Sequence, residues 1–435
     1  MERFAMQKLA EWKEKNGRKP LIIRGARQVG KTWIMKEFGK RYFEQVAYVN
    51  FDSNVRMQQV FEGELDIERI ILALSIETGI SIKAENTLLI FDEVQEVPKA
   101  LISLKYFYEN APEYAIVAAG SLLGVALHRG TSFPVGKVDF MDLYPLSFQE
   151  FLYALGEERF ATMLKGKDTD MVTMFKSKYV DRLREYYYVG GMPEVVNKYV
   201  TSKDFNQVRE IQKNLLNYYQ QDFLKHAEIN LVPRLNIVWN SIPMQLAKEN
   251  KKYIYGQVRE GARAKDFELA IQWLLDCGLI HKVNRVKKPA LPLKAYLDLD
   301  AFKIFLLDIG LLIAMTDLDA KVIIEGNRIF TEFKGALTEQ FVLQQLTAEV
   351  GTEPYYYSAP NSKGEIDFLI QGKTSIIPLE VKAEENLKAK SLKAFCDKYN
   401  PKYAIRTSMS DYREQDWMKN IPLYNIDRIR ECIMN

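Results

Sequence analysis

The sequence predicts an α/β protein whose first third folds around a parallel sheet. Four apolar runs span residues 21–23, 46–51, 87–91 and 115–119, and a fifth lies around 138–140. Helix-like stretches separate the runs, and near-continuous apolar strands are typical of a sheet that helices cover on both faces. A glycine-bounded loop follows the first run, and a helical pattern begins directly after that loop. Later helical segments and a second set of strands indicate further domains.

Length and composition are typical of a soluble globular protein with several domains. A chain of 435 residues is too long for a single ordinary hydrophobic core. Of its residues, 47% are apolar and 27% are charged. A net charge of +3 is nearly balanced and does not indicate a nucleic-acid binder by itself. The three scattered cysteines, Cys277, Cys396 and Cys432, indicate a reducing compartment without a disulfide framework or zinc cluster. Because no leader or bilayer-spanning apolar run is visible, we expect a cytoplasmic protein with no membrane partner.

The loop after the first apolar run fits G-x-x-x-x-G-K-[ST], the phosphate-binding loop (P-loop) of nucleoside triphosphatases. Its residues are Gly25, Ala26, Arg27, Gln28, Val29, Gly30, Lys31 and Thr32. The glycines let backbone N–H groups turn toward phosphate oxygens, Lys31 reaches the β- and γ-phosphates, and the Thr32 hydroxyl binds Mg²⁺. The N-terminus of the following helix favours an anion. The motif therefore predicts a nucleotide and Mg²⁺ as ligands, without separating ATP from GTP.

An acidic pair, Asp92 and Glu93, closes the third apolar run. We expect Asp92 to hold the Mg²⁺ shell beside Thr32 and Glu93 to orient and deprotonate the attacking water. Together with the loop at 25–32, this pair predicts a nucleoside triphosphatase (NTPase).

Further candidates follow the fourth run. Ser121 either senses the γ-phosphate and positions the water or simply belongs to a turn that ends the strand. Arg129 and Lys137 are candidates for the cation that offsets charge on the transferring phosphoryl group, although each also fits a solvated loop.

Several segments along the chain form a recognisable set: residues 25–32, 89–95, 120–121, 143–151, 190–194 and 302–312. Together they resemble the predicted prokaryotic AAA-type ATPases that carry a C-terminal domain of unknown function, number 4143. The resemblance covers nearly the whole chain and implies a P-loop ATPase core over residues 1–150, ATP as the nucleotide and a helical lid over it. One departure is Gly136–Lys137, where the family usually has Gly-Arg. Lysine lacks the planar fork of arginine, so we expect no arginine finger at this position.

The middle of the chain predicts a helical lid over 151–228 and a winged-helix unit over 229–325. A glycine-rich break at 190–193 fits either a hinge or a structural turn. Two helical patterns, a glycine and an alternating strand at 279–286 resemble a winged helix-turn-helix. Basic residues gather there: Arg259, Arg263, Lys265, Lys282, Arg285, Lys287 and Lys288. Both a DNA-contacting unit and a packing module stay open.

The C-terminal segment, residues 326–435, predicts an α/β domain with a nuclease-like set of side chains. Glu339 lies in an amphipathic helix, Asp367 in one strand, and Glu380 and Lys382 two apart in the next. Residues two apart share one face of a strand, so Glu380 and Lys382 point the same way and Asp367 can join them. Two carboxylates can chelate Mg²⁺, and the lysine can activate water. The set resembles the restriction-endonuclease fold, with Glu339 as its extra helix acid; an inert interaction domain with an ordinary Glu/Lys face is the alternative.

These observations predict an ATP-binding, ATP-hydrolysing protein whose nucleotide state gates a C-terminal region that binds nucleic acid or a partner protein. Two alternatives stay open: an ATP-regulated, Mg²⁺-dependent nuclease acting on DNA or RNA, and a non-enzymatic nucleotide-dependent interaction switch. An oligomer is compatible with each of these.

Overall fold

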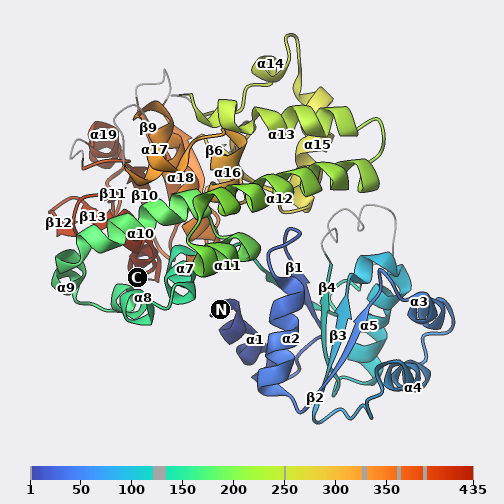
Figure 1. Cartoon of the computed structure of the whole chain (residues 1–435). Helices are drawn as coiled ribbons and strands as arrows, with labels where there is room; N and C mark the ends of the chain where they lie inside the picture. The colour runs from blue at the N-terminus through green and yellow to red at the C-terminus, as the bar shows by residue number, and fades with distance from the viewer. Residues whose placement is uncertain are drawn as a thin grey trace. The chain divides into compact units, whose positions relative to one another are not determined.

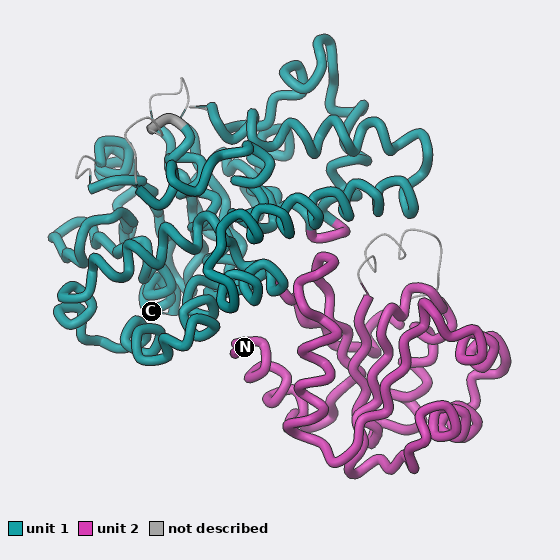
Figure 2. Tube along the Cα trace, viewed as in Figure 1, with its two compact units in different colours: residues 1, 145–275, 279–435 teal, residues 2–144, 276–278 magenta. Residues whose placement is uncertain are grey.

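The computed structural model describes residues 2–120, 134–248, 251–325, 331–359, 364–385 and 389–434, except the side chains of 331 and 332. The chain divides into two compact units (Figure 2). The N-terminal unit comprises residues 2–144 and 276–278, and the C-terminal unit comprises residues 145–275 and 279–435.

A five-stranded parallel sheet forms the centre of the N-terminal unit (Figure 1). Its order is β2-β3-β4-β1-β5, and every pairing is parallel. The strands are β1 (Leu21–Arg24), β2 (Gln45–Asn50), β3 (Thr87–Asp92), β4 (Ala115–Ala119) and β5 (Asp139–Asp142). The predicted parallel α/β core is therefore confirmed, with the loop 25–32 between β1 and a helix.

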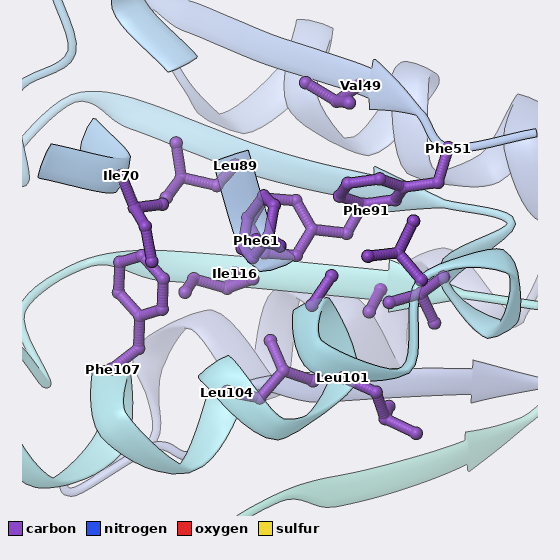
Figure 3. Packing of buried hydrophobic residues seen from close by; sticks show 14 of the residues in the cluster. Val49, Phe51, Phe61, Ile70, Leu89, Phe91, Leu101, Leu104, Phe107 and Ile116 are labelled. Carbon is purple, nitrogen blue, oxygen red and sulfur yellow. The ribbon is translucent and has the colours of Figure 1, made fainter. Parts of the chain in front are cut away.

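Helices pack on the two faces of this sheet. They are α1 (Ala5–Glu14), α2 (Lys31–Tyr42), α3 (Val55–Glu62), α4 (Ile67–Thr78) and α5 (Pro98–Asn110). Helices α3, α4 and α5 bury an apolar cluster against one face, where the rings of Phe51, Phe61 and Phe91 pack edge to face (Figure 3). On α2, Gly39 lies so close to Val46 that an added Cβ would stand 2.5 Å from it. This tight packing fixes α2, and hence the loop before it, against the strands.

Helices dominate the first part of the C-terminal unit. They are α7 (Phe148–Ala154), α8 (Glu158–Lys165), α9 (Thr169–Met174), α10 (Lys176–Val189), α11 (Pro193–Ser202), α12 (Phe205–His226), α13 (Val232–Leu246), α14 (Tyr255–Val258) and α15 (Ala264–Asp276). The region expected as a helical lid is thus helical. The break at 190–193 is a close-packed turn, because a Cβ on Gly191 would lie 2.2 Å from the Leu146 carbonyl oxygen.

An eight-stranded mixed sheet forms the rest of the C-terminal unit, in the order β12-β13-β11-β10-β9-β8-β6-β7. The strands are β6 (Ile280–Val286), β7 (Leu297–Leu306), β8 (Tyr355–Ser358), β9 (Glu365–Gln371), β10 (Ile376–Val381), β11 (Ile405–Ser408), β12 (Arg413–Glu414) and β13 (Lys419–Pro422). The strand expected as the wing, β6, pairs with β7 on one side and in parallel with β8 on the other. The strands before the expected boundary at 325/326, β6 and β7, and the strands after it therefore belong to one continuous sheet. The pairing with β7 and β8 satisfies the backbone hydrogen-bonding groups on both edges of β6.

The further helices of the C-terminal unit are α16 (Ile309–Met315), α17 (Ala320–Ile324), α18 (Thr331–Gln345), α19 (Lys390–Tyr399) and α20 (Arg430–Met434). Helices α16, α18 and α19 pack against the second sheet. Leu392 and Phe395 of α19 join a core with Tyr355, Tyr357 and Ile366. Throughout the ranges that the structure describes, no helix combines the length and apolarity needed to cross a membrane.

Candidate nucleotide site

The loop 25–32 adopts a backbone that few side chains permit. Gly25 and Gly30 have φ values of 150° and 94°, and Gln28 also has a positive φ of 69°. A Cβ on Gly25 would lie 2.3 Å from the Leu143 carbonyl oxygen, so only glycine fits there. Gly30 then precedes α2, which begins at Lys31. The curled loop therefore ends at a helix N-terminus, an arrangement suited to phosphate.

Lys31 folds back over the loop. Its ammonium donates to the Gly25 carbonyl over 2.9 Å and to the Ala26 carbonyl over 2.7 Å. The residue is only 6% exposed, and this burial lowers its pKa to about 8, although the carboxylates of Glu93 and Asp92 oppose the shift. Phosphate oxygens are stronger acceptors than carbonyls for an ammonium. Lys31 can therefore exchange its loop contacts for a phosphate.

A hydroxyl and a carboxylate meet at the end of β3. Thr32 Oγ1 donates to Asp92 Oδ2 over 2.7 Å, and Asp92 is only 2% exposed. The same oxygen accepts from the Tyr48 hydroxyl over 3.0 Å, while Asp92 Oδ1 accepts from the Glu93 N–H over 3.2 Å. Hydroxyl and carboxylate oxygens are the donors that Mg²⁺ prefers. This donor set, beside a loop that fits phosphates, therefore suits a magnesium nucleotide.

Glu93 stands at the carboxyl end of β3 in a strained backbone. Its φ and ψ are 51° and 43°, in the left-handed region, which costs a non-glycine residue of order 1 kcal/mol. The Gln95 side-chain amide donates to Glu93 Oε2 over 2.6 Å. The carboxylate lies beside Asp92 in sequence and is one of the charges that act on Lys31. A carboxylate in this position can take a proton from water.

Of the remaining candidates of this region, Lys137 is described and lies away from the nucleotide loop. Ser121 and Arg129 lie outside the described residues. Lys137 bridges to Glu109 over 2.9 Å just before β5. Because β5 runs parallel to β1 and Asp139 pairs with Leu21, Lys137 lies at the amino ends of the strands. The loop 25–32 follows their carboxyl ends, so Lys137 lies at the opposite edge of the sheet.

In the C-terminal unit, the predicted acids lie among buried lysines. Glu339 of α18 pairs with Lys251 and, at 3.6 Å, with Lys303. Lys303 of β7 is fully buried and also pairs with Glu365 of β9 over 2.5 Å. Burial favours neutral lysine, but the carboxylates of Glu339 and Glu365 outweigh it and raise the Lys303 pKa. The ammonium groups of Lys251 and Lys303 therefore neutralise charge on Glu339 and Glu365.

Asp367 and Glu380 have separate partners. Asp367 accepts from the Val381 N–H over 2.7 Å, and burial together with Glu339 raises its pKa to about 7. Glu380 pairs with Lys382 over 2.9 Å, so these two share a face as expected. Across the described part of the chain, no three His, Cys, Asp or Glu side chains gather in a way that could hold a metal ion. The nuclease-like arrangement thus stays a prediction from sequence, with Glu339 and Glu380 paired to lysines and Asp367 hydrogen-bonded to a backbone N–H.

The family described as an AAA domain matches residues 17–152, and a domain of unknown function (DUF4143) matches residues 334–426. The chain carries an AAA domain and a C-terminal DUF4143 domain. This confirms the family resemblance that the motifs of the sequence indicate. A second domain of unknown function (DUF8612) matches residues 180–322 of this AAA-type protein, across the expected boundary between lid and winged helix.

Solved structures of low identity also match the AAA-type chain. The Walker-type ATPase PABY2304 of Pyrococcus abyssi is 15% identical, with a TM-score of 0.43, covering 72% of this chain and 94% of its own. The Aeropyrum pernix ORC1 protein in complex with DNA is 12% identical, with a TM-score of 0.28 and coverages of 72% and 91%. Drosophila ORC bound to DNA is 12% identical, with a TM-score of 0.25 and coverages of 72% and 93%. No curated protein matches the chain. The AAA assignment therefore rests on the family match and on the loop at 25–32.

Proposed function

We propose that this AAA-type protein binds ATP with Mg²⁺ and hydrolyses it. The observation that carries the proposal is the 2.7 Å hydrogen bond from Thr32 to Asp92, which joins the loop motif to the acidic pair. In this proposal Lys31 and the loop N–H groups hold phosphate oxygens, while Thr32 and Asp92 hold the metal. A bound Mg²⁺ supplies charge neutralisation to the phosphates. Glu93 orients the attacking water and accepts its proton.

We propose further that the nucleotide state acts on the C-terminal unit through the segment 143–146. One end of this segment touches the loop: the Leu143 N–H donates to the Arg24 carbonyl over 2.8 Å, and its own oxygen leaves no room for a side chain on Gly25. The Tyr144 carbonyl accepts from Arg3 over 2.6 Å. A shift of the loop on nucleotide binding therefore moves Leu143.

The other end of the segment is fixed inside the C-terminal unit. The Leu146 N–H donates to the Gly191 carbonyl over 2.7 Å, and the Leu146 carbonyl accepts from the buried Tyr186 hydroxyl over 2.5 Å. The Gly191 N–H in turn donates to the buried carboxylate of Asp308 over 2.6 Å. Only Tyr144 and Pro145 separate the two anchored residues. Such a short connection has little slack to absorb a displacement, which supports coupling along the chain.

The gated region, in this proposal, binds nucleic acid or a partner protein and does not cut DNA or RNA. The ammonium groups of Lys251 and Lys303 pair with Glu339 and Glu365, and their charges also act on Asp367, one of the two carboxylates that a catalytic metal would need. A divalent cation would have to displace these charges. We therefore propose a binding role for the C-terminal unit in place of the nuclease alternative.

A nucleotide switch without hydrolysis is the second candidate, and one contact favours it. Gln95 holds the Glu93 carboxylate over 2.6 Å. This hydrogen bond occupies one oxygen of the carboxylate and competes there with the attacking water.

The test is a phosphate-release assay with ATP and Mg²⁺ on the full chain, comparing wild type with Glu93→Gln and Lys31→Ala. We expect Glu93→Gln to bind ATP but to lose turnover by about 100-fold or more, and Lys31→Ala to lose binding. Undiminished phosphate release from Glu93→Gln would remove Glu93 from this role. ATP binding with no turnover in wild type would favour the switch. Adding DNA or RNA of several shapes tests whether the C-terminal unit responds to nucleic acid.

A further inference from the structure

Tyr48 contacts the metal-side carboxylate from a strand that carries no part of the nucleotide motifs. It lies in β2, paired with Ile90 of β3, so its side chain shares a face with Asp92 two residues farther along. The Tyr48 hydroxyl donates to Asp92 Oδ2 over 3.0 Å, the same oxygen that accepts from Thr32. A phenol hydroxyl keeps its proton throughout the neutral range and is therefore a donor in this contact.

A cation lies on the ring of the same tyrosine. The ammonium of Lys36, on α2, stands 3.6 Å from the centroid of the Tyr48 ring. A positive charge over the face of a phenol draws electron density from the ring and strengthens its hydroxyl as a donor. Contacts thus run from α2 through Lys36 to Tyr48, on to Asp92, and back to α2 through Thr32. This closed set fixes the direction of the Asp92 carboxylate.

We propose that Tyr48 is a positioning residue that orients the Asp92 carboxylate for Mg²⁺ at the nucleotide site. The inference rests on the proposed function, because it concerns how that site holds its metal. Thr32 and Tyr48 together occupy Asp92 Oδ2, while Oδ1 accepts the longer bond from the Glu93 N–H at 3.2 Å. If the hydrogen bond from Tyr48 is lost, Thr32 is the remaining donor to Oδ2 and the carboxylate can rotate. Rotation weakens the metal contact and leaves the contacts of Lys31 and the loop with phosphates intact.

The test measures binding of a fluorescent ATP analogue to the full chain, with excess EDTA and across a Mg²⁺ titration. Tyr48→Phe keeps the ring and removes only the hydroxyl. We expect metal-free affinity to stay within about twofold of wild type, and the tightening that Mg²⁺ produces to fall about tenfold, the scale of one hydrogen bond to a charged group. Lys36→Met should give a smaller loss of about two- to threefold, because it weakens the donor without removing it.

Two controls separate this role from a structural one. Tyr42→Phe, an exposed tyrosine on α2, should leave both affinities unchanged. In an Asp92→Asn background, Tyr48→Phe should have no further effect on Mg²⁺ dependence, because its action passes through Asp92.

Three results would overturn the proposal. Full Mg²⁺ tightening in Tyr48→Phe removes the role of the hydroxyl, and an equal loss with and without Mg²⁺ shows a structural role instead. Additive losses in the Asp92→Asn background show that Tyr48 does not act through Asp92. Absence of nucleotide binding in wild type is a different failure, because it overturns the proposed function itself and Tyr48 with it.

Discussion

Thr32 Oγ1 and Asp92 Oδ2 lie 2.7 Å apart although 60 positions separate them in the chain. The contact joins the first turn of α2 to the last residue of β3, and both side chains stand at the carboxyl edge of the parallel sheet. In open α/β sheets this edge is where ligands bind. The phosphate loop and the acidic pair, which are separate motifs in sequence, are therefore one group of atoms in space.

The Thr32 hydroxyl gives the first prediction. Thr32→Ala removes both the donor to Asp92 and an oxygen for Mg²⁺, while Thr32→Ser keeps them. Because a metal ion contributes several kcal/mol to phosphoryl transfer, we expect Thr32→Ala to lower kcat for ATP by at least about 100-fold. Thr32→Ser should stay within a few-fold of wild type in the same steady-state assay. Equal activity of the alanine and serine variants would contradict the assignment.

The Lys31 ammonium predicts a pH dependence of nucleotide binding. Its pKa is lowered from 10.5 to about 8, so Lys31 loses its charge as the pH rises through 8. ATP affinity should therefore fall above pH 8, by up to about tenfold per pH unit. Titration with a fluorescent nucleotide between pH 7 and 9.5 measures this fall. A flat profile would show that Lys31 stays fully charged in the free protein.

Stability should change in the opposite direction over the same pH range. Between about 8 and 10.5 the unfolded chain binds the Lys31 proton and the folded chain does not. The Lys31 contribution to the free energy of unfolding therefore rises with pH across this window. Lys31→Met lacks the titrating group, so the difference in urea stability between it and wild type should change with pH in that window.

The buried lysine of β7 predicts a large loss of stability. Lys303→Met removes the ammonium partner of Glu365 and leaves Glu339 with Lys251 alone, and breaking a buried ion pair typically costs about 3–5 kcal/mol. Urea unfolding of the full chain measures the loss. Adding Glu365→Gln to Lys303→Met should recover part of it, because one unpaired charge disappears. The matched control is Lys294→Met, whose pair with Glu353 is exposed and should change the urea midpoint little.

The glycine turn at 190–191 predicts a steric effect. Gly190 has a φ of 75°, and an added Cβ would lie 2.2 Å from Asp308 Oδ1. Gly190→Ala must displace a carboxylate that also accepts from the N–H groups of Gly191 and Leu311. We expect a loss of about 2–4 kcal/mol in the free energy of unfolding. Gly335→Ala, in α18 with nothing within 4 Å of its added Cβ, should instead be neutral or stabilising by up to about 1 kcal/mol.

Some residues of the site carry a signal in the sequence and others do not. The loop at 25–32 and the pair Asp92–Glu93 are visible because each chemical task needs a fixed residue type at a fixed spacing. Lys303 carries a weaker signal, as a lone charge in the apolar run of β7. Tyr48 carries none, because its role depends on the pairing of β2 with β3 and on Lys36 approaching its ring. The partners of Glu339 are equally hidden, since Lys251 and Lys303 come from two separate segments.

The sequence by itself determined the parallel α/β core, the phosphate loop and the family, because these follow from local patterns of apolar residues, glycines and short motifs. The tertiary structure alone decided that β6 and β7 extend the C-terminal sheet, and that Lys251 and Lys303 pair with the predicted acid Glu339. Pairing between distant strands and the meeting of buried charges depend on which segments pack together. Local preference does not encode that choice, because the free energy that selects it comes from burial and hydrogen bonding across the whole unit.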